Sequence, residues 1–142
     1  MAAVKSCGYF YNLEQKNMTI TDYMTIEEIF SRLYEEYGES KFNWQFISFS
    51  NKSFVNELKK ELGDNDAFIM DDVWAVAKCT ANDDVLFVNI NGPWRIYHLT
   101  YSLNNAEGFP RYIEFADRKE VGEYWQNQII NSFEGEEYLT IK

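Results

Sequence analysis

The stretch VLFVNINGPWRIYHLTYS, residues 85–102, decides the predicted fold because it contains two β-rich runs separated by a turn signal. In the first run, residues 85–90, apolar side chains occupy both alternating faces, which is typical of a strand buried on both sides. Asn91-Gly92 is a strong hairpin signal, and Pro93 ends the turn. The stretch therefore predicts an antiparallel pair whose first strand is central in its sheet.

Further β-rich runs extend this pair on either side. VWAVAKCT, residues 73–80, precedes it, and RYIEF, residues 111–115, follows it after a longer loop rich in Asn, Gly and Pro. The turn-forming ANDD at residues 81–84 joins the first two runs. Together they predict an antiparallel meander of about four strands. FNWQFISFS, residues 42–50, alternates imperfectly and predicts one more short strand.

Two helices are predicted before the strands. TIEEIFSRLYEEYG, residues 25–38, places its apolar side chains on one helical face, and Thr25 with Glu28 matches a capping box. SFVNELKKELG, residues 53–63, predicts a second helix with Ser53 as its N-cap.

A third helix is predicted at the C-terminal end. Asp117 can cap it together with Glu120, and Gly135 is expected to end it. Gly122 lies within its first turns, where glycine costs about 1 kcal/mol relative to alanine. We therefore expect a neighbouring element to pack closely at Gly122. The tail, residues 136–142, is expected to add a short edge strand.

These elements predict one α+β domain over residues 1–142, with two N-terminal helices, the meander, and the C-terminal helix packed on the sheet. Helices can cover one face of this sheet. The other face needs either the aromatic segment GYFYNL, residues 8–13, or a partner chain such as a second copy in a homodimer.

Composition narrows the classes of partner. The 142 residues include 23 acidic and 13 basic side chains, and the net charge of −10 disfavours a nucleic-acid ligand. The same charge can steer the chain toward a basic protein. No apolar run has the length of a secretion signal or a membrane span, so we expect a cytoplasmic protein whose Cys7 and Cys79 are reduced.

His98 is the single histidine of the chain, and its role decides between sheet architecture and catalysis. We interpret it as a half-buried sheet residue with one satisfied nitrogen, and the alternative is a general base. Cys79 is expected to be separated from His98 by the strand at residues 85–90, which disfavours Cys–His catalysis. One histidine and two distant cysteines make no zinc site, and no phosphate-binding motif is present. We therefore expect neither a metal nor a cofactor.

Three segments carry a resemblance: DDVWAVAKC at residues 71–79, DDVLFVNINGPWRIYHLTYS at residues 83–102, and GFPRYIEFADRKEVGEYW at residues 108–125. They resemble small bacterial proteins with an HLT-aromatic-Ser strand, some of which are immunity proteins of polymorphic-toxin systems. The resemblance implies a non-enzymatic protein that binds and neutralises a toxin. Tyr101 stands where tryptophan is expected, and no functional residue is carried over.

The leading hypothesis is therefore an immunity-type inhibitor of a basic toxin domain, with acids steering the partner and aromatic rings anchoring it. The candidate partner-binding residues lie near the hairpins and are Asp83, Asp84, Trp94, Arg95 and Tyr97. One alternative is a small-molecule-binding module whose aromatic-lined pocket lies on the sheet face bearing Trp94 and His98. Another is a hydrolase that uses His98 with carboxylates.

Overall fold

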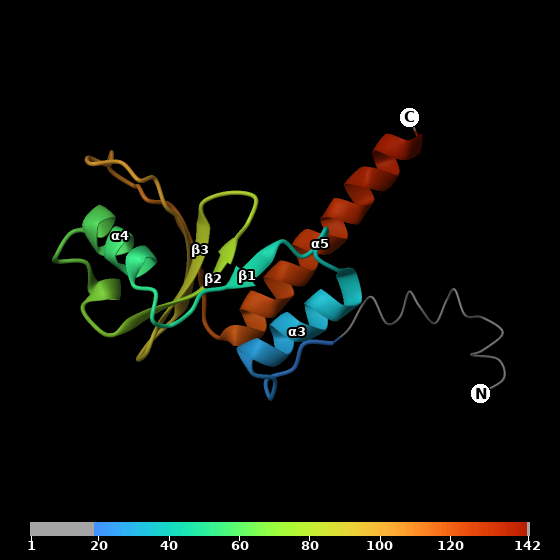
Figure 1. Cartoon of the computed structure of the whole chain (residues 1–142), viewed down its shortest axis with the longest axis horizontal. Coiled ribbons are helices and arrows are strands. Elements are labelled where there is room, and N and C mark those ends of the chain that lie inside the picture. The colour runs from blue at the N-terminus through green and yellow to red at the C-terminus, as the bar shows by residue number, and fades with distance from the viewer. Residues whose placement is uncertain (1–18, 142) are drawn as a thin grey trace. The chain divides into compact units, whose positions relative to one another are not determined.

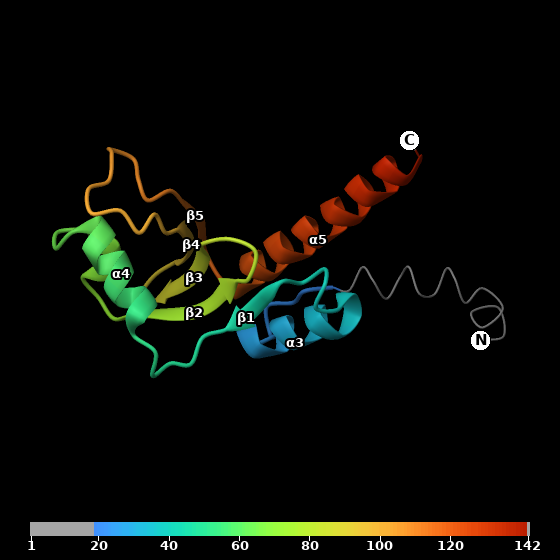
Figure 2. The ribbon, with the colours of Figure 1, turned by 45° about the horizontal axis from the view of Figure 1, so that its top comes forward.

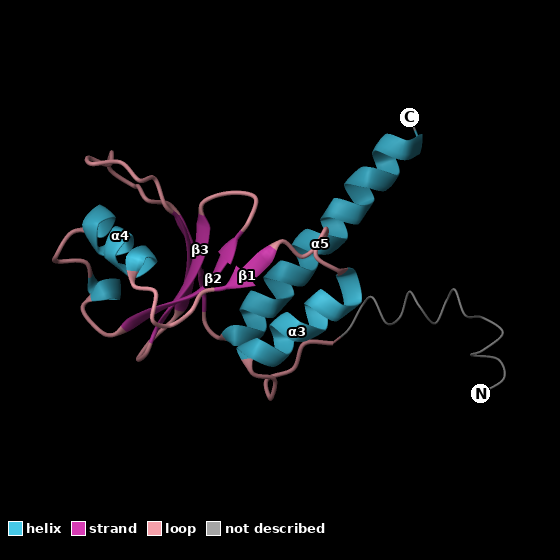
Figure 3. Ribbon diagram, viewed as in Figure 1, coloured by secondary structure: helices cyan, strands magenta, loops and turns pink. Residues whose placement is uncertain are grey.

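A computed structural model describes the backbone of residues 19–141 and the side chains of residues 19–133. Within that part of the chain, helices and an antiparallel sheet confirm the predicted α+β class (Figure 3). The helices are α3 (Ile26–Tyr37), α4 (Ser53–Leu62), the short 3₁₀ helix η1 (Ala67–Ile69) and α5 (Arg118–Ile141). The strands are β1 (Trp44–Phe46), β2 (Val73–Cys79), β3 (Asp84–Asn89), β4 (Trp94–His98) and β5 (Tyr112–Phe115).

These elements form two compact units. One unit contains α3 and α5, and the other spans Asn43–Asp117 and contains the whole sheet. The expected single domain over residues 1–142 stays a prediction. The segment at residues 8–13, which was expected to cover a sheet face, lies outside the described residues.

The described sheet has five strands in the order β1-β2-β3-β4-β5, and all neighbouring strands are antiparallel. Figure 1 labels β1, β2 and β3, and Figure 2 labels all five. The central position of β3 is confirmed, because Val85, Leu86 and Phe87 on its two faces are all 0% exposed. The predicted meander of about four strands is confirmed as β2 to β5, and the further short strand expected within residues 42–50 is also present. The imperfectly alternating segment forms β1, whose Trp44 is the register partner of Cys79 on β2.

The β3–β4 hairpin is confirmed, and the buried Asn89 organises its turn. The backbone N–H of Gly92 donates to the carbonyl of Asn89 at 3.1 Å, and the N–H of Asn91 donates to Asn89 Oδ1 at 2.8 Å. Asn89 Nδ2 also donates to the carbonyl of Phe68 at 2.7 Å. The side chain thus satisfies its own buried polar atoms while it ties the hairpin to η1.

Helix α4 packs on one face of the sheet, as Figure 2 shows. The core between them is apolar and consists of Val55, Leu58, Phe68, Ala75, Val85, Phe87, Tyr97 and Leu99. The prediction of Ser53 as N-cap was wrong: Lys52 is the N-cap and makes no side-chain cap bond. Asn51 Oδ1 instead accepts from the backbone N–H of Ser53 at 3.0 Å. Asn51 supplies the acceptor because its side-chain carbonyl reaches the first helical N–H from two residues upstream.

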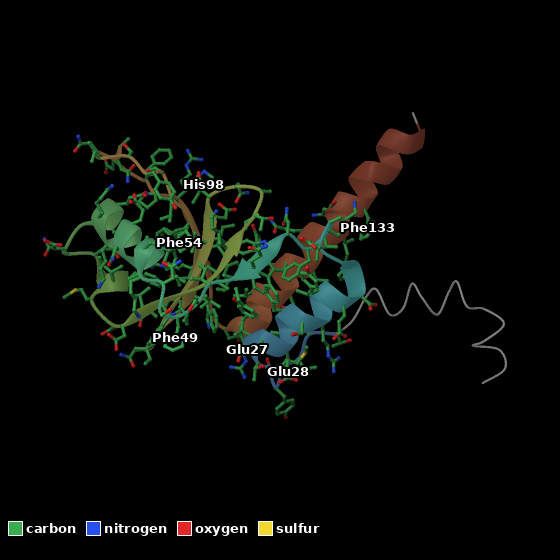
Figure 4. The ribbon with its side chains drawn as sticks, in the orientation of Figure 1. Glu27, Glu28, Phe49, Phe54, His98 and Phe133 are labelled. Carbon is green, nitrogen blue, oxygen red and sulfur yellow. The ribbon has the colours of Figure 1, made fainter. Side chains whose placement is uncertain are left out.

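The predicted capping box of α3 is confirmed. The N–H of Glu28 donates to Thr25 Oγ1 at 3.1 Å, and the N–H of Thr25 donates to Glu28 Oε1 at 3.3 Å. Figure 4 labels Glu28 at this end of the helix. The apolar face is also as predicted, since Ile29, Leu33 and Tyr37 are buried.

Helix α5 begins directly after Asp117, as expected, but it continues past Gly135 to Ile141. The expected helix end at Gly135 and the expected edge strand at residues 136–142 were therefore wrong. One interior glycine costs only about 1 kcal/mol, and Glu134, Glu136 and Glu137 beside it are good helix formers.

The expected close approach at Gly122 is confirmed within the unit that contains α3 and α5. A β-carbon added there would lie 2.8 Å from Ile29 Cγ2 and 3.1 Å from Ile20 Cγ2. The start of α5 is also held by Arg118, which donates to the carbonyls of Met24 and Asp22. The absence of a side chain at position 122 is what allows α3 and α5 to touch.

We expect Gly122→Ala to destabilise the protein although alanine is the better helix former. The new methyl group would press on the branched, fully buried Ile29, and overpacking of this kind costs roughly 1–3 kcal/mol. Urea denaturation measures the loss. Because Ile29→Ala removes the obstructing methyl, the double variant should lose less than the sum of the two single losses, and strict additivity would contradict this packing.

Candidate functional site

Asp84 and His98 form a hydrogen-bonded pair at one end of the sheet. They are register partners on β3 and β4, and His98 Nδ1 lies 2.8 Å from Asp84 Oδ1. The His98 side chain is 57% exposed and the Asp84 side chain 22%. Figure 4 labels His98. One nitrogen is therefore satisfied, as expected, but the ring is more exposed than the half-buried position that the sequence predicted.

This pair has the geometry of an oriented imidazole. A carboxylate at Nδ1 holds the proton on that nitrogen, so the lone pair of Nε2 is available to accept a proton or a hydrogen bond. Cys79 is buried on β2, and β3 separates it from His98 as predicted. His98 can therefore act as a base or as a hydrogen-bonding group, but it does not contact the thiol of Cys79.

The segment 99–102, which follows His98 and completes the sequence HLTYS, is held by Glu61 of α4. The backbone N–H of Thr100 donates to Glu61 Oε1 and that of Tyr101 donates to Glu61 Oε2, each at 2.9 Å. The hydroxyl of Thr100 also lies 2.9 Å from Glu61 Oε1. One carboxylate thus satisfies two successive backbone donors where the chain leaves the sheet.

Glu57 lies one helical turn before Glu61 on α4, so the two carboxylates influence each other electrostatically. The hydrogen bond with Glu61 and then burial raise the pKa of Glu57. Burial alone would raise the pKa of Glu61, but hydrogen bonds from Glu57, Thr100 and Tyr101 together lower it. Sequence analysis missed both residues. Their i, i+4 spacing on one helix face was the available signal, although such spacing on a solvated helix is common.

Tyr101 is exposed beside these two carboxylates. Its ring is 50% exposed, and its φ of 55° is unusual for a residue other than glycine. Burial, followed by the charges of Asp83, Glu57 and Glu61, raises the pKa of the Tyr101 hydroxyl. We call the group Asp83, Asp84, His98 and Tyr101 the Tyr101 surface.

The other predicted partner-binding residues lie farther along the sheet. Trp94 is the register partner of Val88, four residues along β3 from Asp84, which is about 13 Å. Trp94 is partly exposed. The structure therefore places the charge of Asp83 near Tyr101 and pairs Asp84 with His98, and Trp94 lies farther along the sheet.

Arg95 is enclosed by its own unit. Its guanidinium carbon lies 4.5 Å from the centre of the Phe68 ring and 4.1 Å from that of Tyr112. Its Nε donates to Glu114 at 2.9 Å, and Nη1 donates to the Tyr97 hydroxyl at 2.6 Å. With 17% of its side chain exposed, Arg95 is engaged mainly in holding β4, β5 and η1 together.

Tyr97 is 0% exposed, so its ring lies in the core and has no surface for a partner to touch. Burial raises the pKa of its hydroxyl to about 12, against the lowering effect of Arg95. Tyr97 points toward α4 because it alternates with His98 along β4. Its part in the site is to position Arg95.

The described residues form no cluster of metal ligands, and the depression recorded among them does not lie at Trp94 and His98. No group of three or more His, Cys, Asp or Glu side chains in residues 19–133 could hold a metal ion. A depression of about 310 Å³ is lined by Phe30, Ser31, Tyr34 and Glu35 of α3. It includes neither Trp94 nor His98. No helix in the described chain combines the length and apolar character that a membrane crossing demands.

Comparisons with known protein families, with curated proteins and with solved structures find no match to this chain. The candidate site is therefore interpreted from its own geometry.

We expect Arg95→Lys to lower the free energy of unfolding by roughly 1–3 kcal/mol, measured in urea. Lysine lacks the flat group that lies between Phe68 and Tyr112, and it would leave the buried Tyr97 hydroxyl without its donor. The control is Glu114→Gln, whose side chain is 49% exposed and should cost under about 1 kcal/mol. Equal losses for the two variants would contradict the enclosed role of Arg95.

Proposed function

We propose that this chain is a non-enzymatic binding protein that neutralises a basic protein domain through the Tyr101 surface, in the manner of an immunity protein. The observation that supports the proposal most is the half-exposed ring of Tyr101 beside the charges of Asp83, Glu57 and Glu61. An exposed aromatic ring within a negative field suits a lysine or arginine side chain.

The two parts of this surface have different physical roles. Exposed acids such as Asp83 attract a basic partner over distances of about 10 Å at moderate salt, which raises the association rate. A ring that becomes buried in the complex supplies hot-spot energy and slows dissociation. The net charge of −10 favours the same class of partner.

The backbone around Tyr101 supports a preorganised contact. Glu61 fixes the N–H groups of Thr100 and Tyr101, so the ring is presented from an ordered segment. Preorganisation reduces the entropy that binding would otherwise cost. A cytoplasmic location belongs to the same proposal, and the free thiol of Cys79 is compatible with it.

We expect Asp83→Lys combined with Asp84→Lys to weaken binding to the product of the neighbouring gene by at least about tenfold, mostly through a slower association rate. The salt dependence of the affinity should fall in parallel. Surface plasmon resonance over a salt series measures both quantities.

A matched control lies in the same unit. Asp71 and Asp72 are also consecutive aspartates and both are exposed, and they precede β2 as Asp83 and Asp84 stand at the start of β3. Asp71→Lys combined with Asp72→Lys changes the net charge equally, so it should affect binding much less. Equal losses for the two double variants, or affinity indifferent to salt, would overturn the proposed surface.

A second candidate function is hydrolysis with His98 as general base. The observation that favours it is the exposed imidazole whose Nδ1 is held by Asp84. This role also needs a substrate proton within reach of Nε2.

His98→Gln separates the two functions. Under the binding proposal this variant neutralises the partner within about threefold of the original protein, because glutamine remains a polar, uncharged contact. If His98 is a general base, hydrolysis falls by about 10²-fold or more. Parallel assays of partner inhibition and of ester and phosphodiester hydrolysis decide between these outcomes.

A further inference from the structure

Strand β5 forms one edge of the described sheet, and its side chains are open to solvent (Figure 2). Among the described strands it pairs with β4 alone. Tyr112 is 50% exposed, Ile113 is 44% exposed, and the Glu114 side chain is 49% exposed. At the other edge, Trp44 of β1 is only 3% exposed. An open edge strand presents backbone groups to which a further strand can bind.

The ladder between β4 and β5 decides which backbone groups of this edge face outward. The N–H of His98 donates to the carbonyl of Arg111 at 2.9 Å. Hydrogen-bonded positions alternate along an antiparallel pair, so Arg111 and Ile113 turn their backbone groups toward β4. The N–H and C=O groups of Tyr112 and Glu114, on either side of Ile113, therefore point away from the sheet.

The two faces of this edge differ in chemistry. Ile113 is the register partner of Ile96, which is 3% exposed and lies on the face turned away from α4. Tyr112 and Glu114 lie on the other face, where Glu114 accepts from Arg95 Nε at 2.9 Å. The edge thus offers an apolar row on one face, and a phenol and a carboxylate on the other.

We propose that β5 pairs antiparallel with β5 of a second copy of this chain, about a two-fold axis that passes through Ile113 perpendicular to the sheet. In this register Tyr112 of each copy lies opposite Glu114 of the other copy. The outward N–H groups of both residues then find carbonyl acceptors in both copies. This self-association goes beyond the proposed function and does not rest on it.

Charge and hydrogen bonding select this register. A two-fold axis perpendicular to the sheet keeps each face on its own side, so the pairing can slide only in steps of two residues. One such step sets Glu114 opposite Glu114 of the second copy, and like charges directly opposite destabilise a strand pair. The step in the other direction sets Glu114 opposite Pro110, which has no N–H to donate. With the axis at Ile113, an uncharged phenol lies opposite each carboxylate.

The face turned away from α4 supplies the apolar contact. Ile113 meets Ile113 of the second copy at a position without backbone hydrogen bonds, where two Cα atoms lie about 4.5 Å apart and side chains are closest. The apolar row of Ile96 and Ile113 thereby continues into the same row of the second copy, which favours pairing. Because β5 has only four residues, the interface is short and the dimer belongs to the weak, concentration-dependent class.

Sedimentation equilibrium of the full chain, at concentrations from roughly 10 µM to 1 mM, tests the association. We expect a reversible monomer–dimer equilibrium that added salt strengthens, because two chains of net charge −10 repel each other. Salt weakens binding to a basic partner, so this association and the proposed function can fail separately. A chain that stays monomeric at about 1 mM, or a dimer that dissociates as salt rises, would overturn the proposal.

Matched lysine variants locate the interface. Ile113→Lys sets two ammonium groups opposite each other at the axis and should raise the dimer dissociation constant by at least about tenfold. The control is Ile90→Lys, which makes the same change at a residue that is 61% exposed and lies after β3. It should leave the dissociation constant within about twofold. Equal effects of the two variants would show that β5 is not the interface.

Cysteine cross-linking tests the register, and it does so even if Ile113→Lys does not fold. In Ile113→Cys the two new thiols meet at the axis, so oxidised glutathione should link the copies through position 113, as peptide mass spectrometry can show. In the control Glu114→Cys the Cα atoms of the two new residues lie roughly 9 Å apart on the diagonal, which is too far for a disulfide. No link at position 113, or equal linking in both variants, would contradict the proposed pairing.

Discussion

The burial of β3 on both faces is the constraint on which the sheet depends. Val85 and Phe87 face the core beneath α4, and Leu86 lies on the opposite face, yet all three are fully buried. A shift of one residue in register would exchange these faces and move Asp84 into the core. The register of β3 therefore also fixes that of β2 and β4, and with it the pairing of Asp84 with His98.

After β4 ends, the backbone N–H groups stop donating to a neighbouring strand and donate to a side chain of α4. The N–H of Leu99 donates to the carbonyl of Asp83, and the next two N–H groups donate to Glu61. A helix side chain thus replaces the strand as acceptor from Thr100 onward, two residues after β4 ends at His98. Because buried backbone donors must be satisfied, this replacement lets the loop between β4 and β5 leave the sheet without leaving polar groups unpaired.

Periodicity predicted most of the fold, since the alternation of residues 85–90 and the helical face of residues 26–37 reflect burial directly. It failed where a small local preference decided the outcome. At the start of α4 the side-chain acceptor is Asn51 and not Ser53, and Gly135 does not end α5. Asp83 and Asp84 lie at the β2–β3 hairpin, as expected, and their role in partner binding stays a prediction. Glu61 was missed because its partners are backbone groups far along the chain, and Tyr97 was placed at a surface although alternation directs it inward.

The order of the two compact units along the chain has a consequence for biosynthesis. Asn43–Asp117 is continuous in sequence, whereas α3 and α5 pack together from either side of it. During translation at about 5–20 residues per second, the sheet unit is complete before α5 leaves the ribosome. Helix α3 is therefore synthesised before the sheet unit, and its apolar face at Ile29 and Leu33 cannot pack on α5 until that unit has been synthesised.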